Sequence, residues 1–146
     1  MRAVVQRVSR AEVRVGDEIV GAIGAGLCVL VGVTHTDDVA VARRMASRIW
    51  HLRVFDDEAG VMNRSLADGC GSVLVVSQFT LYGDTSRGRR PSWADAAPSE
   101  RAAPCVSALC EELRALGADV ATGRFGARMR LALVNEGPVT VIVEVG

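Results

Sequence analysis

Two nearly continuous apolar runs constrain the fold of this chain more than any other feature. Residues 26–33 read GLCVLVGV and residues 73–79 read VLVVSQF, so each run has about the length of one strand. Strands with apolar side chains on both faces are typical of the covered interior of a sheet. The two runs therefore predict two buried strands with other elements packed against both of their faces.

Shorter strand patterns predict six further strands. They lie at residues 3–15, 18–23, 52–55, 119–122, 127–134 and 139–145. In the first of these segments, simple alternation would place six side chains on one face of the sheet. These are Val5, Arg7, Ser9, Ala11, Val13 and Val15.

Only two segments have the apolar spacing of a helix. The first reaches from residue 39 to about residue 52 and follows Asp37 and Asp38, acidic residues of the kind that a helix N-terminus favours. The second begins near Ser99, which can cap it, and is closed by Gly117. Two helices are too few to cover both faces of a large parallel sheet. We therefore expect an α/β protein with a mixed or antiparallel sheet system and both helices on one side.

Composition narrows the class of protein. The length of 146 residues suits one domain, spanning residues 1–146, and no apolar run reaches the roughly 20 residues that cross a membrane. The N-terminus has no apolar signal region, so we expect a cytoplasmic protein without a membrane partner. Four cysteines without CxxC spacing and two distant histidines give no reason to expect a metal or a cofactor.

The charge pattern allows only a limited contact with nucleic acid. The formal net charge is zero, which argues against a domain wrapped broadly in nucleic acid, because such domains are usually strongly basic. Two clusters of arginines could still bind a few phosphates. They are Arg87, Arg89 and Arg90, and Arg124, Arg128 and Arg130. Solvated surface charge is the alternative interpretation of either cluster.

Two short segments carry the strongest functional signal. They read SQFTLYGD at residues 77–84 and NEGPVT at residues 135–140. Each couples a strand end to a sharp loop of small and polar residues, where a pocket would have exposed backbone groups. Neither contains a histidine, a cysteine or a pair of carboxylates. A pocket built from them would depend on backbone geometry more than on reactive side chains.

Each segment has two interpretations. Gly137-Pro138 could form a tight turn between two C-terminal strands, or its carbonyl oxygens could form a rigid wall against a ligand. Thr80 could be a nucleophile only with a base beside it, and the neighbouring sequence supplies none, although His35 or His51 could approach in space. Alternatively, backbone N–H groups around Phe79 and Thr80 would stabilise a developing oxyanion, which suffices for a reactive ester.

Five motifs, taken together and in order, resemble the D-aminoacyl-tRNA deacylase family. They are QRV at residues 6–8, SQFTLYGD, RPSW at residues 90–93, TGRFGARM at residues 122–129, and NEGPVT. The agreement extends over essentially the whole chain. The family usually has aspartate where Glu136 stands, which is a conservative departure.

The resemblance implies an enzyme that hydrolyses the ester between a D-amino acid and the 3′ end of tRNA, and also glycyl-tRNA mischarged on tRNA(Ala). It implies a three-layer β/β/α fold and a homodimer with its active site at the subunit interface. A cis Gly-Pro motif would be lent to the partner's pocket, and the substrate's own ribose 2′-hydroxyl would assist catalysis.

The resemblance also assigns roles to ten residues. Gly137 and Pro138 would reject L-amino acids, and Arg7 would hold their orientation. Phe79 and Thr80 would be catalytic and, with Ser77 and Gln78, would line the opposite wall. The residues near the terminal adenosine would be Phe125, Gly126 and Met129.

Two rival functions follow from the residues alone. A threonine-nucleophile amidase or esterase would act on free D-amino acid derivatives without RNA and would depend strongly on Thr80. A non-catalytic nucleic-acid-binding dimer would use the arginine clusters and would convert no substrate. The agreement of the motifs favours the deacylase over both.

Overall fold

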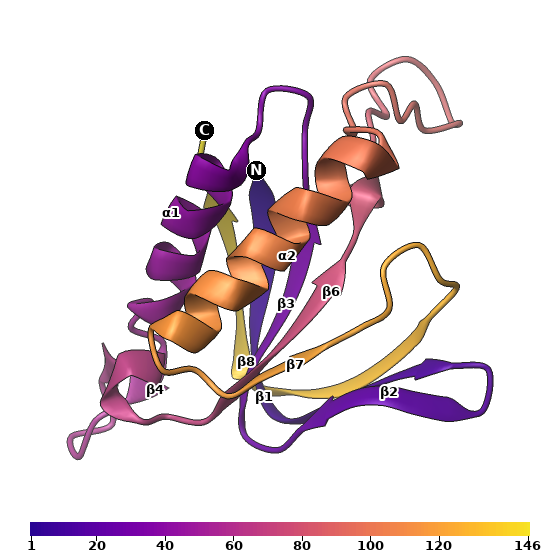
Figure 1. Cartoon of the computed structure of the whole chain (residues 1–146). Helices are drawn as coiled ribbons and strands as arrows, with labels where there is room; N and C mark the ends of the chain where they lie inside the picture. Colours follow the sequence, from indigo (N-terminus) through magenta and orange to yellow (C-terminus); the bar gives the residue numbers. More distant parts are fainter.

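The computed structural model describes residues 1–146 and shows an α/β protein (Figure 1). Its helices are α1 (Val39–Trp50) and α2 (Ser99–Ala115), and two short 3₁₀ helices are η1 (Leu66–Asp68) and η2 (Phe79–Tyr82). Its strands are β1 (Arg2–Val15), β2 (Glu18–Ile23), β3 (Gly26–Gly32), β4 (Phe55–Asp56), β5 (Met62–Arg64), β6 (Ser72–Ser77), β7 (Val120–Thr122) and β8 (Arg130–Glu144).

The main sheet is mixed, and the two apolar runs form its interior strands. The strands follow the order β2-β1-β3-β6-β7, and β8 lies along the other edge of β1. β1 is antiparallel to β2, β3 and β8, whereas β6 is parallel to both β3 and β7. The prediction of two interior strands is therefore confirmed by β3 and β6.

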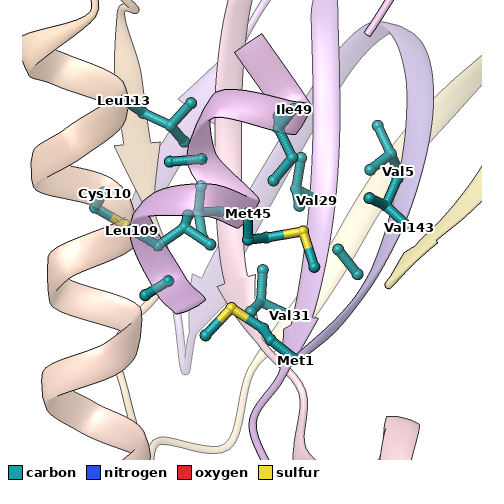
Figure 2. Packing of buried hydrophobic residues seen from close by; sticks show 14 of the residues in the cluster. Met1, Val5, Val29, Val31, Met45, Ile49, Leu109, Cys110, Leu113 and Val143 are labelled. Atoms are coloured by element: carbon teal, nitrogen blue, oxygen red, sulfur yellow. The ribbon is translucent and has the colours of Figure 1, made fainter. Parts of the chain in front are cut away.

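The layers also follow the prediction. Both helices cover one face of the sheet, where Met45 and Ile49 of α1 and Leu109 of α2 join Val29 and Val31 of β3 in the main core (Figure 2). Each fully buried side chain of this size contributes about 1.5–3 kcal/mol of transfer free energy. A second apolar cluster covers the opposite face of β3 and β6, and it includes residues of β1, β2 and β8. The predicted β/β/α arrangement is confirmed.

The predicted single face of the first strand is wrong, because β1 contains a bulge. Val8 pairs with Asn135 of β8, but the next pair is Arg10 with Val134, so Ser9 is an extra residue on β1. An extra residue reverses the alternation of side chains between the two faces. Ala3 and Val5 accordingly face the helices, whereas Val8, Ala11 and Val13 belong to the second cluster, Arg7 is half-buried and Ser9 is exposed.

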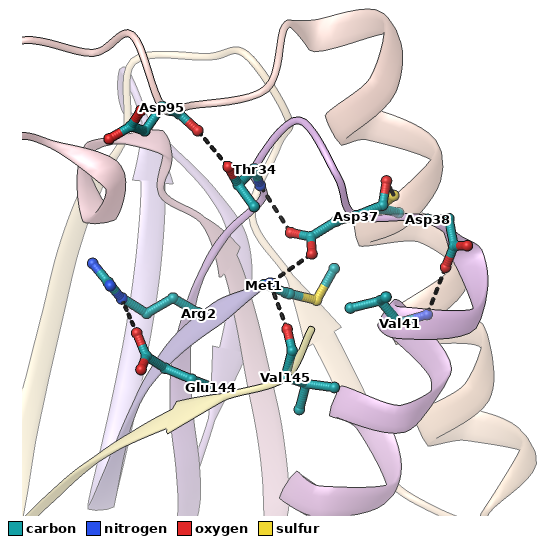
Figure 3. Close-up of polar contacts among 10 residues, drawn as sticks. Met1, Arg2, Thr34, Asp37, Asp38, Val41, Asp95, Glu144 and Val145 are labelled. Atoms are coloured by element: carbon teal, nitrogen blue, oxygen red, sulfur yellow. Dashed lines mark hydrogen bonds and ion pairs between the residues drawn. The ribbon is translucent and has the colours of Figure 1, made fainter.

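The helix starts differ in detail from the expectations. Asp38 caps α1 by accepting a 2.8 Å hydrogen bond from the Val41 N–H. Asp37 is instead buried and binds the Met1 ammonium at 2.7 Å and the Thr34 N–H at 2.8 Å (Figure 3). In α2, Ser99 is the first helical residue and not the cap, because the carbonyl of Pro98 accepts the first bonds of the helix.

Several strand boundaries also differ. The strand predicted at residues 52–55 lies later, as β4, and pairs with β5, which the sequence did not predict. The strand predicted at residues 73–79 ends at Ser77, where the chain turns into η2. The strands predicted at residues 127–134 and 139–145 are parts of one strand, β8, which begins later, at Arg130, and ends at Glu144. None of the helices has the length and apolar character needed to span a membrane.

Candidate active site

A pocket of about 470 Å³ lies between the end of β6, the first half of α2 and the segment that precedes β8. Its walls are mostly apolar, with Val31 and Val33 at the end of β3 and Ala102 and Val106 on α2. Six of the ten predicted site residues line it: Ser77, Gln78, Phe79, Phe125, Gly126 and Met129. This size is within the ordinary range of small-molecule sites.

The end of β6 shapes one wall of the pocket. The Gln78 N–H makes the last ladder bond, to the carbonyl of Val31 at 2.7 Å, and the chain then turns into η2. Phe79 is 57% exposed, and its ring meets that of Trp93 edge-on, with 5.5 Å between the centroids. Gly83 permits this packing, because a Cβ there would lie 2.6 Å from a Trp93 ring carbon.

Two backbone donors at the start of η2 have no partner. The first N–H bonded after Gln78 is that of Leu81, which donates to the Gln78 carbonyl at 3.3 Å. Neither a backbone nor a side-chain acceptor within the protein binds the N–H of Phe79 or Thr80. Adjacent free N–H groups beside a pocket are suited to binding an anionic oxygen.

The side chain of Thr80 is not paired with a base. Its hydroxyl oxygen accepts a hydrogen bond from the side-chain amide of Gln78. The ring of His35 contacts the carbonyl of Ala94 at 2.8 Å, and the ring of His51 contacts the carbonyl of Ser47 at 2.9 Å. Thr80 is exposed and is not among the residues that line the pocket.

Gly137-Pro138 projects from the middle of β8. Gln6 pairs with Thr140 and Val8 pairs with Asn135, so residues 136–139 stand opposite Arg7 alone. Both halves of β8 run along β1 in one direction, and the interpretation as a turn between two strands is therefore wrong. Gly137 and Pro138 are exposed, Gly137 has a φ of +117°, and the peptide bond between them is cis.

The base of this projection is fixed by two side chains. Arg7 donates from Nε to the carbonyl of Glu136 at 3.2 Å. The Asn135 amide donates to the carbonyls of Arg7 and Val139, both at 2.9 Å, and so closes the neck of the bulge. Asn135 belongs to the NEGPVT motif but was not among the predicted site residues. A side-chain amide can donate two hydrogen bonds, and this capacity was the available signal.

The four remaining predicted residues lie outside the pocket of their own chain. Arg7, Gly137 and Pro138 are grouped at the bulge, and Thr80 lies just beyond the pocket lining. The apolar walls from β3 and α2 were not predicted, because their sequence pattern does not differ from that of core residues. No group of three or more His, Cys, Asp or Glu side chains is arranged to hold a metal ion.

Comparison with known proteins gives consistent results. The sequence profile of the family described as D-Tyr-tRNA(Tyr) deacylase matches residues 4–144. A protein of Roseiflexus sp. called D-aminoacyl-tRNA deacylase is 62% identical over 144 residues, which are 99% of this chain and 93% of that protein. A protein of Thermomicrobium roseum that is also called D-aminoacyl-tRNA deacylase is 57% identical over 141 residues, which are 97% of this chain and 92% of that protein.

Solved structures support the same fold. The c-Myc DNA Unwinding Element Binding Protein matches with a TM-score of 0.92 at 41% identity, covering 99% of this chain and 98% of that one. A probable eukaryotic D-amino acid tRNA deacylase matches with a TM-score of 0.81 at 19% identity, covering 97% of each chain. The second similarity concerns the fold alone.

Proposed function

Because the chain belongs to the D-Tyr-tRNA(Tyr) deacylase family, we propose that it is a hydrolase of D-aminoacyl-tRNA that acts as one domain over residues 1–146. Water loses a proton as it adds to the ester carbonyl carbon, which forms a tetrahedral oxyanion. Collapse of this intermediate breaks the bond to the ribose 3′ oxygen, which takes up a proton, and releases a free D-amino acid and tRNA. The same chemistry extends to glycyl-tRNA mischarged on tRNA(Ala), and the cytoplasm is where these substrates would be met.

The single observation that carries the mechanism is the pair of free N–H groups of Phe79 and Thr80 at the edge of the pocket. Donors already aimed at a developing oxyanion stabilise the transition state without reorganisation. An aminoacyl ester is activated, so no protein nucleophile is required. The ribose 2′-hydroxyl of the substrate supplies the polar group that positions or activates the water.

The pocket lining supports an arrangement in which two parts of the substrate contact different walls of the pocket. Ser77 and Gln78 flank the reacting ester on the side of β6, next to the free N–H groups. Phe125, Gly126 and Met129 form the other wall, where the terminal adenosine binds. Phe125 is 41% exposed, and its ring offers a flat apolar surface of the kind on which a nucleobase stacks.

Chiral selection requires a second copy of the chain. Gly137 and Pro138 lie on an exposed bulge, outside the pocket of their own chain, and so are available to a neighbouring subunit. In the proposed homodimer, each bulge enters the partner's pocket at the interface. The hydrogen and the side chain on Cα have interchanged positions in a D-amino acid and an L-amino acid. A rigid wall of carbonyl oxygens beside Cα leaves room for the hydrogen of the D-amino acid. The same wall excludes the side-chain carbon that an L-amino acid would place in that position.

Release of D-tyrosine from D-tyrosyl-tRNA by the purified protein, measured beside D-tyrosine methyl ester, tests this function. We expect rapid hydrolysis of the tRNA ester and slow hydrolysis of the methyl ester, which lacks both adenosine and 2′-hydroxyl. Equal rates on both esters would favour the threonine-nucleophile esterase. A 2′-deoxy terminal adenosine is the matched control for the contribution of the substrate hydroxyl.

The second candidate is a nucleic-acid-binding dimer without turnover. It is favoured by the name of one structural relative, a DNA unwinding element binding protein, and by the exposed cluster of Arg87, Arg89 and Arg90. In the second cluster, Arg124 is paired with the Glu18 carboxylate. This candidate function predicts salt-sensitive binding of nucleic acid and no loss of either ester.

A further inference from the structure

The loop at residues 84–92, here called the arginine arm, concentrates unpaired positive charge. All 17 basic residues of the chain are arginines, and the formal net charge is zero. Six of them form ion pairs with carboxylates: Arg2, Arg7, Arg14, Arg43, Arg64 and Arg124. Arg87, Arg89 and Arg90 are exposed and form no ion pair, and residues 85–91 contain no acid. The arm thus carries three unpaired arginines within four residues, whereas the other eight arginines without an ion pair are spread over the rest of the chain.

The arm has a fixed base. Asp84 and Ser92 exchange two backbone hydrogen bonds, both 2.8 Å, which close the loop at its neck. The Asp84 carboxylate accepts a 2.9 Å bond from the Ser86 N–H, so this acid faces the backbone of its own loop. Gly88 has a φ of +109°, which lets the chain reverse between the arginines.

The base of the arm lies next to a residue that lines the pocket, Phe79. Trp93 follows the neck directly and packs edge-on against Phe79. The next two residues are held by the loop after β3, since the carbonyl of Asp95 accepts from the Thr34 hydroxyl at 2.7 Å and that of Ala94 contacts His35 at 2.8 Å. In Figure 1 the arm extends beyond the N-terminal end of α2, on the side away from α1.

We propose that the arginine arm binds the phosphodiester backbone of the aminoacyl-tRNA close to its 3′ end. The proposal rests on the function proposed above, since a 3′-terminal ester in the pocket obliges the adjoining phosphates to cross the rim. Guanidinium groups bind phosphate oxygens bidentately, and a basic loop at that rim meets them first. The arm gives affinity for the RNA, while the pocket performs the hydrolysis.

A triple variant, Arg87→Gln, Arg89→Gln and Arg90→Gln, separates these two roles. On D-tyrosyl-tRNA we expect kcat/KM to fall roughly tenfold or more, mainly because KM rises. We also expect the slope of log(kcat/KM) against the logarithm of the salt concentration to fall in magnitude by about 2 to 3. On 3′-O-(D-tyrosyl)adenosine, which has no phosphate, we expect no change. The corresponding triple change to lysine keeps the charge and should retain most of the activity.

Arg10→Gln, Arg44→Gln and Arg48→Gln form the matched control, since these arginines are also exposed and without an ion pair, and their removal changes the net charge equally. An unchanged kcat/KM on tRNA, an equal loss on the adenosine ester, or an equal loss in the control would overturn the proposal. If the wild-type protein hydrolyses neither ester, the proposed function fails. In that case the arm is tested by the salt dependence with which the same variants bind tRNA that carries no amino acid. A slope equal to that of the wild-type protein would overturn the proposal for the arm.

Discussion

The Nε atom of Arg7 lies 3.2 Å from the carbonyl oxygen of Glu136, the residue directly before Gly137. On its other side the same guanidinium donates to the Val54 carbonyl at 2.8 Å and to the Asp56 carboxylate at 3.2 Å. Only 13% of the Arg7 side chain is exposed. One side chain therefore ties the exposed bulge in β8 to the hairpin of β4 and β5.

Arg7→Lys should weaken this connection while keeping the charge. A lysine ammonium lacks the planar fork that reaches both sides, and hydrogen bonds to charged groups contribute about 1.5–3 kcal/mol each. We expect the deacylation of D-tyrosyl-tRNA to fall roughly tenfold or more, because each 1.4 kcal/mol in a barrier is a factor of ten. Arg10→Lys, at an exposed position of the same strand, should leave the rate unchanged.

Gly137→Ala should displace the bulge itself. The added Cβ would lie 2.7 Å from Nη2 of Arg7 and 2.9 Å from Cγ2 of Val139, on a backbone with a φ of +117°. We expect a large loss of deacylation together with a lower Tm, since alanine is strained by about 1–3 kcal/mol on such a backbone. Gly24→Ala is the matched control, because a Cβ at Gly24 meets no atom within 4 Å. Full activity of Gly137→Ala would show that the bulge is not part of the site.

Two changes at position 80 distinguish the side chain from the backbone. Thr80→Ala removes the hydroxyl and should retain most of the deacylation rate. Replacing the amide that precedes Thr80 with an ester removes the N–H and keeps the side chain, and loss of one oxyanion donor should cost about 10²–10³ in kcat. The reverse pattern, with a loss of ~10³-fold or more in Thr80→Ala and little effect of the ester, would restore the nucleophile interpretation.

Alkaline pH should destabilise the fold through Cys28. Burial raises the pKa of this thiol from 9.0 to about 11, because the thiolate is poorly solvated there. The contribution is fully present below pH 9 and is lost as the pH rises towards 11, since the unfolded chain releases the proton first. We expect the free energy of unfolding to fall by roughly 2–3 kcal/mol across that range from Cys28 alone. Urea unfolding at several pH values should show a shallower decline in Cys28→Ala.

The sequence predicts the layers of the fold wherever apolar residues recur at regular spacing. The runs at β3 and β6 are apolar at almost every position, and α1 and α2 keep a helical stripe, so the layers follow from burial alone. The extra residue Ser9 could not be predicted, because alternation indicates the two faces but not where the alternation reverses. The sequence predicts two strands where the structure has one, β8, for a related reason. Gly137-Pro138 interrupts the ladder between β8 and β1, but β8 continues along β1 on both sides of the interruption.

The candidate site is predictable only where a strand end or a motif shared with the deacylase family marks it, as at Phe125 and Met129. Ser77, Gln78 and Phe79 were found because a buried strand ends there in small and polar residues. Val31 and Val106 line the same pocket, yet in the sequence they have the spacing of ordinary core residues. The resemblance to the deacylase family implies that Gly137 lies apart from the pocket of its own chain, but no local pattern encodes this property of the tertiary structure.

The central claim, chiral hydrolysis, is tested most directly by one comparison. D-tyrosyl-tRNA and L-tyrosyl-tRNA, prepared on the same tRNA, are followed over time with purified protein and with a no-enzyme control. We predict rapid loss of the D-ester while the L-ester decays at the rate of the control. Loss of both esters at similar rates would contradict the exclusion of L-amino acids by Gly137 and Pro138, and stability of both would contradict the deacylase itself.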